Sequence, residues 1–364
     1  FAKRRVTLCI PLITQRTMLF CLTEQNSLTG GRNSRGFIEL FWFFRRDFVV
    51  NPFHWFTLGW FLNCLGDFEM LVRMIFSALA VALFSSVSLA DITWNFTYND
   101  VVNSTGVGFD DATHGAARRA TFNSVGGYLN SVLDETGVVD FTINDSQTDG
   151  SGFLASAGTL YFTGPNGFTN GLLFEHATTG SDPLSGTRDG QATFDFGYTW
   201  NSELDTTTGS EFDLFTVSLH EITHAMGFSA LVDSNGDSSI SGSNPGVYGV
   251  YASFLERGDG TSLFSAGGNF DGNAGDTTSD DLFFGGANAV AANGGNAVKV
   301  YAPGVFAPGS SISHVDTATY PDSVMTHSVA RGVEKRQYAA IDQGILMDIG
   351  WNFSAVPEPS SAMM

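Results

Sequence analysis

Apolar and polar residues alternate in four segments of the chain, which is typical of strands with one buried face. These segments are residues 92–100, 137–145, 157–164 and 190–202. Apolar positions spaced by three or four residues predict helices over residues 110–136, 211–228 and 338–353. The first of these helices has an acidic start at Asp110 and Asp111, and residues 170–180 are ambiguous. Together the two kinds of element predict an α+β fold, in which a twisted mixed sheet is backed by helices.

Between the last two predicted helices, the pattern changes over residues 229–313. Gly, Asn, Asp and Ser dominate this segment, and only short apolar pieces such as YGVYASFL and VKVYAPG interrupt it. Such a composition is typical of turns and loops. We therefore expect a long, loop-rich insertion with a few short strands.

The first 69 residues show neither period, although they are rich in Phe, Trp and Arg and contain all three cysteines. Residues 70–90 then combine a basic residue, Arg73, with an apolar run too short to span a bilayer and with small residues that end at Ala90. This pattern predicts a secretory signal peptide cut after Ala90, with a buried core helix as the alternative. We therefore expect an exported protein and treat residues 1–69 as an over-extended start outside the fold.

The net charge of the chain after the predicted signal peptide limits the classes of partner that it can bind. Residues 91–364 carry a formal charge of −24 and no cysteine. An exported protein of this kind does not rely on disulfides. Such a negative charge disfavours binding to nucleic acid or to an anionic membrane surface, whereas it is compatible with divalent cations.

The candidate chemistry lies in the helix predicted over residues 211–228, which contains the stretch HEITHAMG. His220 and His224 are four residues apart, so they project from one face of a helix and can share one metal ion. Glu221 lies beside that face, where it can act on a metal-activated water as a general base without being a ligand. Two unrelated histidines on a structural helix are the alternative. Gly227, placed where the helix must stop and turn, favours the metal site.

These residues resemble the pattern HExxHxxGxxH of the metzincin zinc peptidases, but Ala230 stands where that pattern has its third histidine. With SSISHVD, DSVMTHS and DQGILMDIGW, the chain resembles leishmanolysin-like metzincins, in which an insertion precedes the third ligand, and exported bacterial PEP-CTERM metalloproteases. The resemblance covers about residues 91–352. It implies that His314 completes a zinc site with His220 and His224, and that Met325 forms the Met-turn of the family.

Two other residues compete with His314 as the third ligand. Glu256 would make a glutamate-ligated site, but it leaves SISHVD and SVMTH unexplained. His327 is the other candidate, and it follows Met325 by two residues, where some metzincins have a tyrosine that touches the zinc or the oxyanion. The resemblance therefore suggests that His327 stabilises the tetrahedral intermediate, with a surface histidine in a turn as the alternative.

A weaker metal signal lies at the start of the insertion. Asp233, Asn235 and Asp237 alternate as they do in calcium loops, and Ca²⁺ is therefore a second expected cofactor beside Zn²⁺. The glycine falls fourth rather than sixth in this loop, and no Glu follows at position twelve. An ordinary Asx-rich turn is the alternative.

Other residues have expected supporting roles. The strand GQATFDFGYTW, just before the helix, is either an edge strand that pairs with an extended peptide substrate or an internal strand. Asp316 is a candidate to orient His314 by a hydrogen bond. We treat His114 and His176 as structural or exposed.

The expected organisation is a signal peptide over 70–90, a metalloprotease domain over 91–352 and a linker over 353–364. The linker contains VPEPSS, which resembles the start of a PEP-CTERM sorting signal. The transmembrane helix and basic cluster of such a signal do not follow, so membrane anchoring stays open. The expected function is an exported zinc endopeptidase acting on proteins or peptides. The alternative is a non-catalytic, metal-binding surface or adhesion protein with the same fold. The presence of Glu221 disfavours this alternative, because a site without activity has little use for that carboxylate.

Overall fold

The computed structural model describes residues 5–12, 18–25, 37–43, 91–99, 107–145, 150, 152–273 and 275–354, in two compact units that divide after Ser86. In the first unit, an antiparallel sheet that the sequence pattern did not predict contains β1 (Arg5–Leu12), β2 (Met18–Gln25) and β3 (Phe37–Phe43). The predicted signal peptide, residues 70–90, lies outside the described residues, as do 355–364 of the predicted linker. Among the described helices, none has the length and apolar character needed to cross a membrane.

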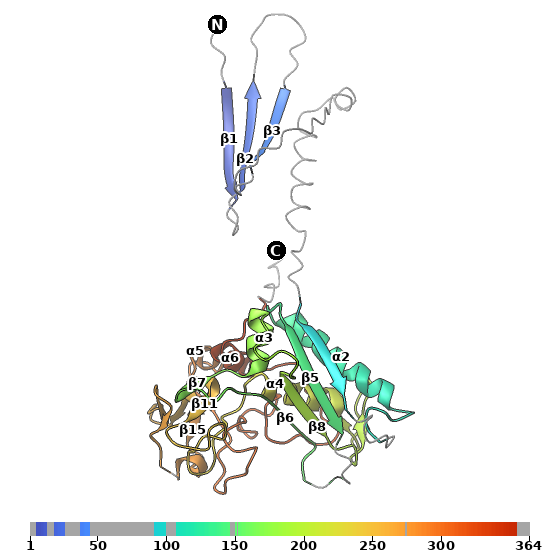
Figure 1. Cartoon of the computed structure of the whole chain (residues 1–364), viewed down its shortest axis with the longest axis vertical. Coiled ribbons are helices and arrows are strands. Elements are labelled where there is room, and N and C mark those ends of the chain that lie inside the picture. Colours follow the sequence, from blue (N-terminus) through green and yellow to red (C-terminus); the bar gives the residue numbers. More distant parts are fainter. Residues whose placement is uncertain are drawn as a thin grey trace, which may run out of the picture. The chain divides into compact units, whose positions relative to one another are not determined.

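The second unit is built on a four-stranded sheet in the order β4-β5-β8-β6 (Figure 1). Its strands are β4 (Thr93–Tyr98), β5 (Val138–Asp145), β6 (Ala155–Thr159) and β8 (Gly190–Phe194). The first three in spatial order are parallel, and β6 runs antiparallel to β8 at the edge. The predicted mixed sheet is therefore confirmed. Of the two alternatives for 190–200, the internal strand is confirmed, because β8 is hydrogen-bonded on both sides and β6 forms the edge.

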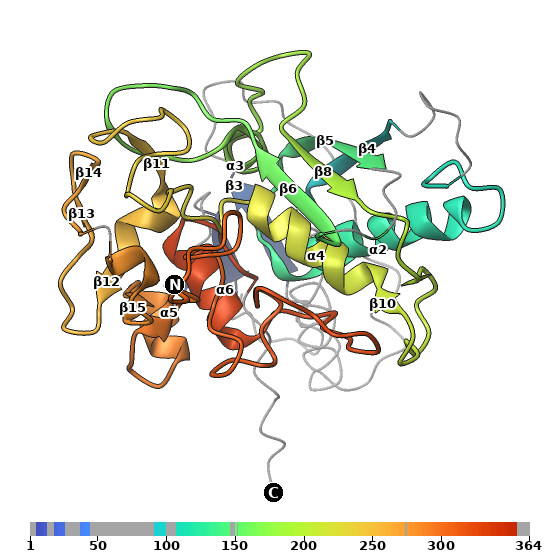
Figure 2. The same ribbon diagram turned by 90° about the horizontal axis from the view of Figure 1, so that it is seen from below.

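Two helices, α2 (Gly115–Val132) and α4 (Leu214–Ala225), pack against each other and on one face of this sheet (Figure 2). Alternate residues of β5 are buried on that face, and Phe122 of α2 meets Phe194 of β8 edge-on, with ring centroids 5.3 Å apart. The helix predicted over 110–136 begins later than expected, at Gly115. Asp111 instead precedes it and accepts the backbone N–H of Thr113 and His114, because a short carboxylate competes for free N–H groups at a helix start.

The ambiguous segment 170–180 forms a helix, α3 (Leu172–Thr179), and α6 (Ala340–Asp348) occupies the predicted C-terminal helix. Residues 229–313 contain the expected short strands and also a helix, α5 (Ala287–Ala292), which packs on α6. Three small sheets of the unit have two strands each: β7 (Gly167–Thr169) with β11 (Val247–Gly249), β9 (Trp200–Asn201) with β10 (Phe212–Asp213), and β13 (Phe264–Ser265) with β14 (Asn269–Phe270). A further small sheet has three strands, in which β15 (Leu282–Phe284) lies between β12 (Leu255–Arg257) and β16 (Val298–Lys299). Two short 3₁₀ helices, η2 (Val250–Phe254) and η3 (Asp276–Thr278), complete it.

The insertion has an aromatic core of its own. Tyr248 and Tyr251 are fully buried in it, and their rings contact Phe264 and Phe284 at centroid distances of 4.8 and 4.9 Å. Buried aromatic rings contribute most of the apolar area that a small core removes from water. This segment is therefore packed against the rest of the unit and can place residues at a fixed position in the site. The observed architecture is α+β, as predicted.

Candidate metal centre

The helix α4 is fixed at both ends by contacts that its sequence provides. At its start, the carboxylate of Asp213 accepts the backbone N–H and the hydroxyl of Thr216, at 3.0 and 2.6 Å, which is a standard N-cap. Just beyond its end, Gly227 has a φ of 104°, a conformation that residues with a side chain rarely adopt. The chain can therefore turn sharply after His224, and the carbonyl of Phe228 comes back to within 2.8 Å of the His224 ring.

Three histidine side chains converge beside this helix. The Nε2 atoms of His220 and His224 are 3.0 Å apart, and that of His314 lies 3.1 Å from each of them. His314 comes from the end of the insertion, 90 residues after His224. The structure thus brings together the three histidines that the resemblance named, and they form one of two groups in the described residues that could hold a metal ion.

The other ring nitrogen of each histidine contacts a backbone carbonyl. The Nδ1 atoms of His220, His224 and His314 lie 2.8 Å from the carbonyl oxygens of Val324, Phe228 and Ser310, respectively. Because a carbonyl only accepts, each Nδ1 carries the proton and each Nε2 presents a lone pair to the centre. Three lone pairs at about 3 Å repel one another unless a cation lies among them, which is the arrangement of a metal site.

Burial keeps these histidines in the state that binds metal. Desolvation lowers the pKa of His220 to about 3 and that of His224 to about 4, and it lowers the pKa of His314 well below its usual range. The imidazoles are therefore neutral near pH 7. The centre of the triangle that their Nε2 atoms form lies about 1.8 Å from each nitrogen, slightly less than the 2.0–2.1 Å of a zinc–nitrogen bond. Zinc therefore fits these three side chains.

Glu221 is buried next to the first histidine, with only 5% of the residue exposed. Within the described part of the chain its carboxyl group forms neither a hydrogen bond nor an ion pair. Desolvation raises the pKa of Glu221 to about 8. A buried carboxyl without a partner costs folding free energy, so the fold alone gives no reason for a glutamate at this position.

The segment that carries Met325 contacts two parts of the site. The carbonyl of Val324 accepts a hydrogen bond from Nδ1–H of His220. The next residue, Met325, is fully buried, and its carbonyl accepts the backbone N–H of Val315 at 3.0 Å. Val315 directly follows His314. The same short segment therefore fixes the ring of His220 and the backbone beside His314, although their positions in the sequence are far apart.

A buried aspartate of α6 holds this segment in turn. The carboxylate of Asp342 accepts the backbone N–H of Val324 at 3.0 Å and the hydroxyl of Ser323 at 2.5 Å, and it also accepts the N–H of Ala339. Asp342 is fully buried. It lies two hydrogen bonds away from His220, so it determines where the first ligand points.

Replacing Asp342 by asparagine is expected to weaken zinc binding about 10- to 100-fold, because the amide group cannot accept all three hydrogen bonds and the Val324 carbonyl shifts. Competition with a chromogenic chelator measures the affinity. Asp348→Asn is the matched control: this residue lies in the same helix, and its carboxylate accepts N–H groups from Asn288 and Ala289. The control should lose stability but keep its zinc affinity. Equal zinc affinities in the two variants would contradict a positioning role for Asp342.

The other candidates for the metal site lie elsewhere. Glu256 is in β12, paired with Phe283 of β15, and belongs to neither metal-holding group. His327 is also outside both groups: its ring stacks on that of Tyr301 with centroids 3.7 Å apart, and its Nδ1 lies 2.9 Å from the hydroxyl of Thr317. The expected roles of Glu256 and His327 as third ligand are therefore not supported by their positions.

The expected role of Asp316 is corrected, whereas calcium binding at 233–237 stays a prediction. Asp316 accepts the N–H and the hydroxyl of Thr319, and the carbonyl of Ser310 orients His314 in its place. At 233–237, the Asp233 carboxylate accepts the N–H groups of Asn235 and Asp237, which is the alternative Asx-type turn. Short carboxylates bond to nearby backbone N–H groups in preference to more distant partners.

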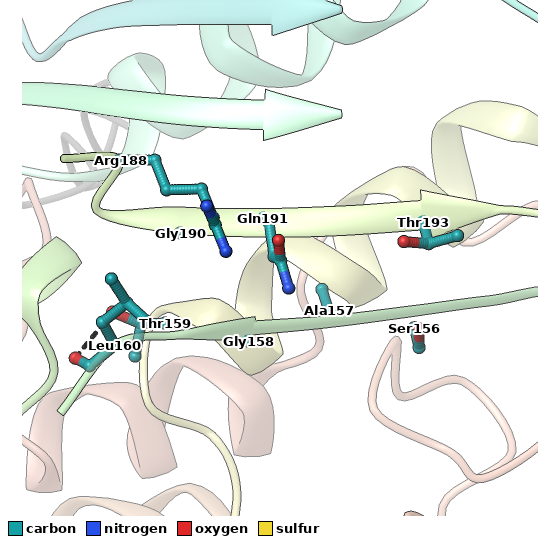
Figure 3. Close-up of a pocket in the computed structure, with 9 residues that line it drawn as sticks. All are labelled: Ser156, Ala157, Gly158, Thr159, Leu160, Arg188, Gly190, Gln191 and Thr193. Carbon is teal, nitrogen blue, oxygen red and sulfur yellow. Dashed lines mark hydrogen bonds between the residues drawn. The ribbon is translucent and has the colours of Figure 1, made fainter. Parts of the chain in front are cut away.

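A surface pocket elsewhere on the sheet does not contain the histidines. It lies between β6 and β8 and is lined by Ser156, Ala157, Gly158, Thr159, Leu160, Arg188, Gly190, Gln191 and Thr193 (Figure 3). Gln191 and Thr193 alternate with Ala192 and Phe194, which are buried under the helices. The pocket is therefore on the opposite face of the sheet from α2 and α4.

Sequence reasoning missed the groups that orient the ligands. Two of them, the carbonyls of Ser310 and Val324, leave no trace in a sequence because every residue has a carbonyl. Asp342 falls within DQGILMDIGW, yet its role could not be read from that stretch. Comparison of the chain with protein-family models, with curated proteins and with solved structures finds no match.

Proposed function

We propose that this chain is an exported, zinc-dependent endopeptidase with a metzincin-type catalytic domain. The observation that carries the proposal is the convergence of three neutral histidines at Nε2 distances of 3.0 to 3.1 Å beside a buried glutamate. Three protein ligands with one further position left for water or substrate are typical of catalytic zinc, whereas structural zinc usually has four protein ligands. The proposal that the protein is exported depends on the signal-peptide pattern in the sequence of residues 70–90.

The chain's own residues would move the proton in this reaction. Zinc, when bound by His220, His224 and His314, supplies Lewis-acid activation of water and of the substrate carbonyl. Glu221 takes a proton from the attacking water, whose oxygen bonds to the carbonyl carbon, and gives that proton to the amide nitrogen as the C–N bond breaks. Burial raises the pKa of Glu221, which makes its carboxylate a stronger base towards water and lets the carboxyl group keep the proton until the amide nitrogen takes it.

An extended peptide fits beside β6. This strand has β8 on one side only in the described sheet, and it packs against α4, which carries the two histidines of the motif. A free strand edge can pair with a substrate backbone without selecting its side chains. The substrate role expected for residues 190–200 is therefore assigned to β6 in this proposal.

Glu221 also separates the proposal from its alternative, a metal-binding surface or adhesion protein without activity. Such a protein would gain stability from an apolar or neutral residue at this buried position. The unpaired carboxyl is explained by catalysis and not by metal retention, because Glu221 is not one of the three converging ligands.

Removing the metal tests the proposed function directly. The purified chain should hydrolyse a fluorogenic peptide or casein, lose this activity after dialysis against a strong chelator, and recover it with Zn²⁺ but not with Mg²⁺. Mg²⁺ is the control because it prefers oxygen ligands to imidazole. Full hydrolysis by the metal-free protein would contradict the proposal.

A further inference from the structure

A second group of metal-ligating side chains shares no residue with the three histidines. It consists of Asp140 in β5, His176 in α3 and Asp189 just before β8, and one ligand atom from each lies within 4.8 Å of the other two. Asp140 alternates along β5 with Val139 and Phe141, which are buried under α2 and α4. The group therefore lies on the opposite face of the sheet, where α3 contacts β5.

The parallel pairing of β5 and β8 forces the two aspartates together. The N–H of Asp189 donates to the carbonyl of Asp140 at 2.8 Å, and the N–H of Asp140 donates to Oδ2 of Asp189 at 2.7 Å. The same Oδ2 lies 2.8 Å from Nδ1 of His176. The carboxylate of Asp189 thus contacts the imidazole, while the carboxylate of Asp140 accepts Nδ2–H of Asn95 at 2.9 Å and has an oxygen within 4.8 Å of the other two ligand atoms.

One atom of this group lacks a partner. Oδ1 of Asp189 is buried and forms no hydrogen bond with any described residue, and Asp189 as a whole is only 1% exposed. Oδ2 of the same carboxylate has two partners, so the side chain cannot turn to satisfy Oδ1 without losing them. A buried, unsatisfied carboxylate oxygen costs free energy and requires a positively charged or hydrogen-bonding partner.

The charge of the group is also unbalanced. Two carboxylates face a single histidine, and burial raises the pKa of Asp189, with the neighbouring Asp140 carboxylate acting in the same direction. Arg188 is exposed and forms no ion pair with the group. A cation between the carboxylates would supply both the missing charge and the missing partner of Oδ1.

We propose that Asp140, His176 and Asp189 bind a second divalent metal ion, which joins α3 to strands β5 and β8. Two carboxylate oxygens and one imidazole nitrogen favour a first-row transition ion such as Zn²⁺ over Ca²⁺ or Mg²⁺. Asp140 is only partly buried, and Arg188 and Gly190, the neighbours of Asp189, line the open pocket of Figure 3. Solvent and ions can therefore reach this end of β8. The ion has a structural role, and the proposal does not depend on peptidase activity.

Counting zinc tests the second site. After loading with Zn²⁺ and dialysis, the intact chain should hold two equivalents by mass spectrometry of the metal, Asp140→Asn one, His314→Ala one, and the double variant none. Asp195→Asn is the matched control, because this buried aspartate accepts N–H groups from Gly150 and Gly197 with its two oxygens. The control should keep two equivalents. A single equivalent in the intact chain that Asp140→Asn retains, or two equivalents in Asp140→Asn, would overturn the second site.

Thermal unfolding gives an independent readout in which activity plays no part. In the His314→Ala background, a chelator should lower the melting temperature, because only the second ion remains to be removed. The same treatment should leave the melting temperature of His314→Ala/Asp140→Asn unchanged. If the chelator has no effect in His314→Ala, the group is a metal-free His176–Asp189 ion pair and the proposal fails.

Discussion

Replacing Glu221 by glutamine is expected to lower peptide hydrolysis about 10²- to 10⁴-fold, the usual contribution of a general base, while the protein keeps its zinc. Glutamine has the volume of glutamate but cannot take a proton from water. Because Glu221 is not among the converging ligands, the zinc content should equal that of the unchanged chain. Turnover of a fluorogenic peptide and metal analysis of the same sample measure the two quantities.

The same substitution should raise the stability of the folded chain. Glu221 is buried without a partner, and a neutral amide is less costly to bury than a carboxylate. A higher melting temperature together with lost activity is the signature of a residue retained for function. Glu256→Gln is the control and should leave hydrolysis unchanged. Equal hydrolysis by Glu221→Gln and the unchanged chain, with zinc present in both, would end the claim of catalysis by Glu221.

Replacing His314 by alanine is expected to remove zinc from the proposed catalytic site and to abolish hydrolysis. Two histidines remain, whereas catalytic zinc normally has three protein ligands, so the affinity should fall by more than about 100-fold. Metal analysis after dialysis and the peptide assay measure the effect. The loss is informative because His314 lies 90 residues from His224, beyond the reach of any local motif.

His327→Phe is the matched control for this variant. Phenylalanine can keep the stacking on Tyr301 but not the contact with the Thr317 hydroxyl. The control should retain zinc, because His327 is not in the converging group. Unchanged turnover of the peptide by His327→Phe would also contradict the hypothesis that His327 stabilises the oxyanion. Loss of one zinc equivalent in His327→Phe, with no equivalent lost in His314→Ala, would reverse the ligand assignment.

Periodicity predicted those elements in which one face is buried. The alternation along β5 and the apolar spacing of α4 both reflect packing on the same core, so their positions were clear from the sequence. Helix α5 was missed because it is only six residues long and made mainly of alanine. The sequence could not decide whether 190–200 is an edge or an internal strand, because alternation gives the faces of a strand but not its neighbours in the sheet.

The candidate site could be predicted only in part. His220, Glu221 and His224 are four residues apart or fewer, so helical geometry alone places them together. His314 was predicted only through resemblance to a family with an insertion, since no spacing rule spans that distance. The group around Asp189 had no signal, because it depends on which strands become neighbours in the sheet.

The route of the chain through the candidate site also sets the order in which that site can be completed during synthesis. The first ligand, at 220, is held by the carbonyl at 324, and that segment is held by the carboxylate at 342. A growing chain that has passed the HEITH motif therefore has neither the last histidine nor the contacts that aim the first one. Because domains fold as units, a nascent or truncated chain that ends before α6 should lack the peptidase activity proposed above.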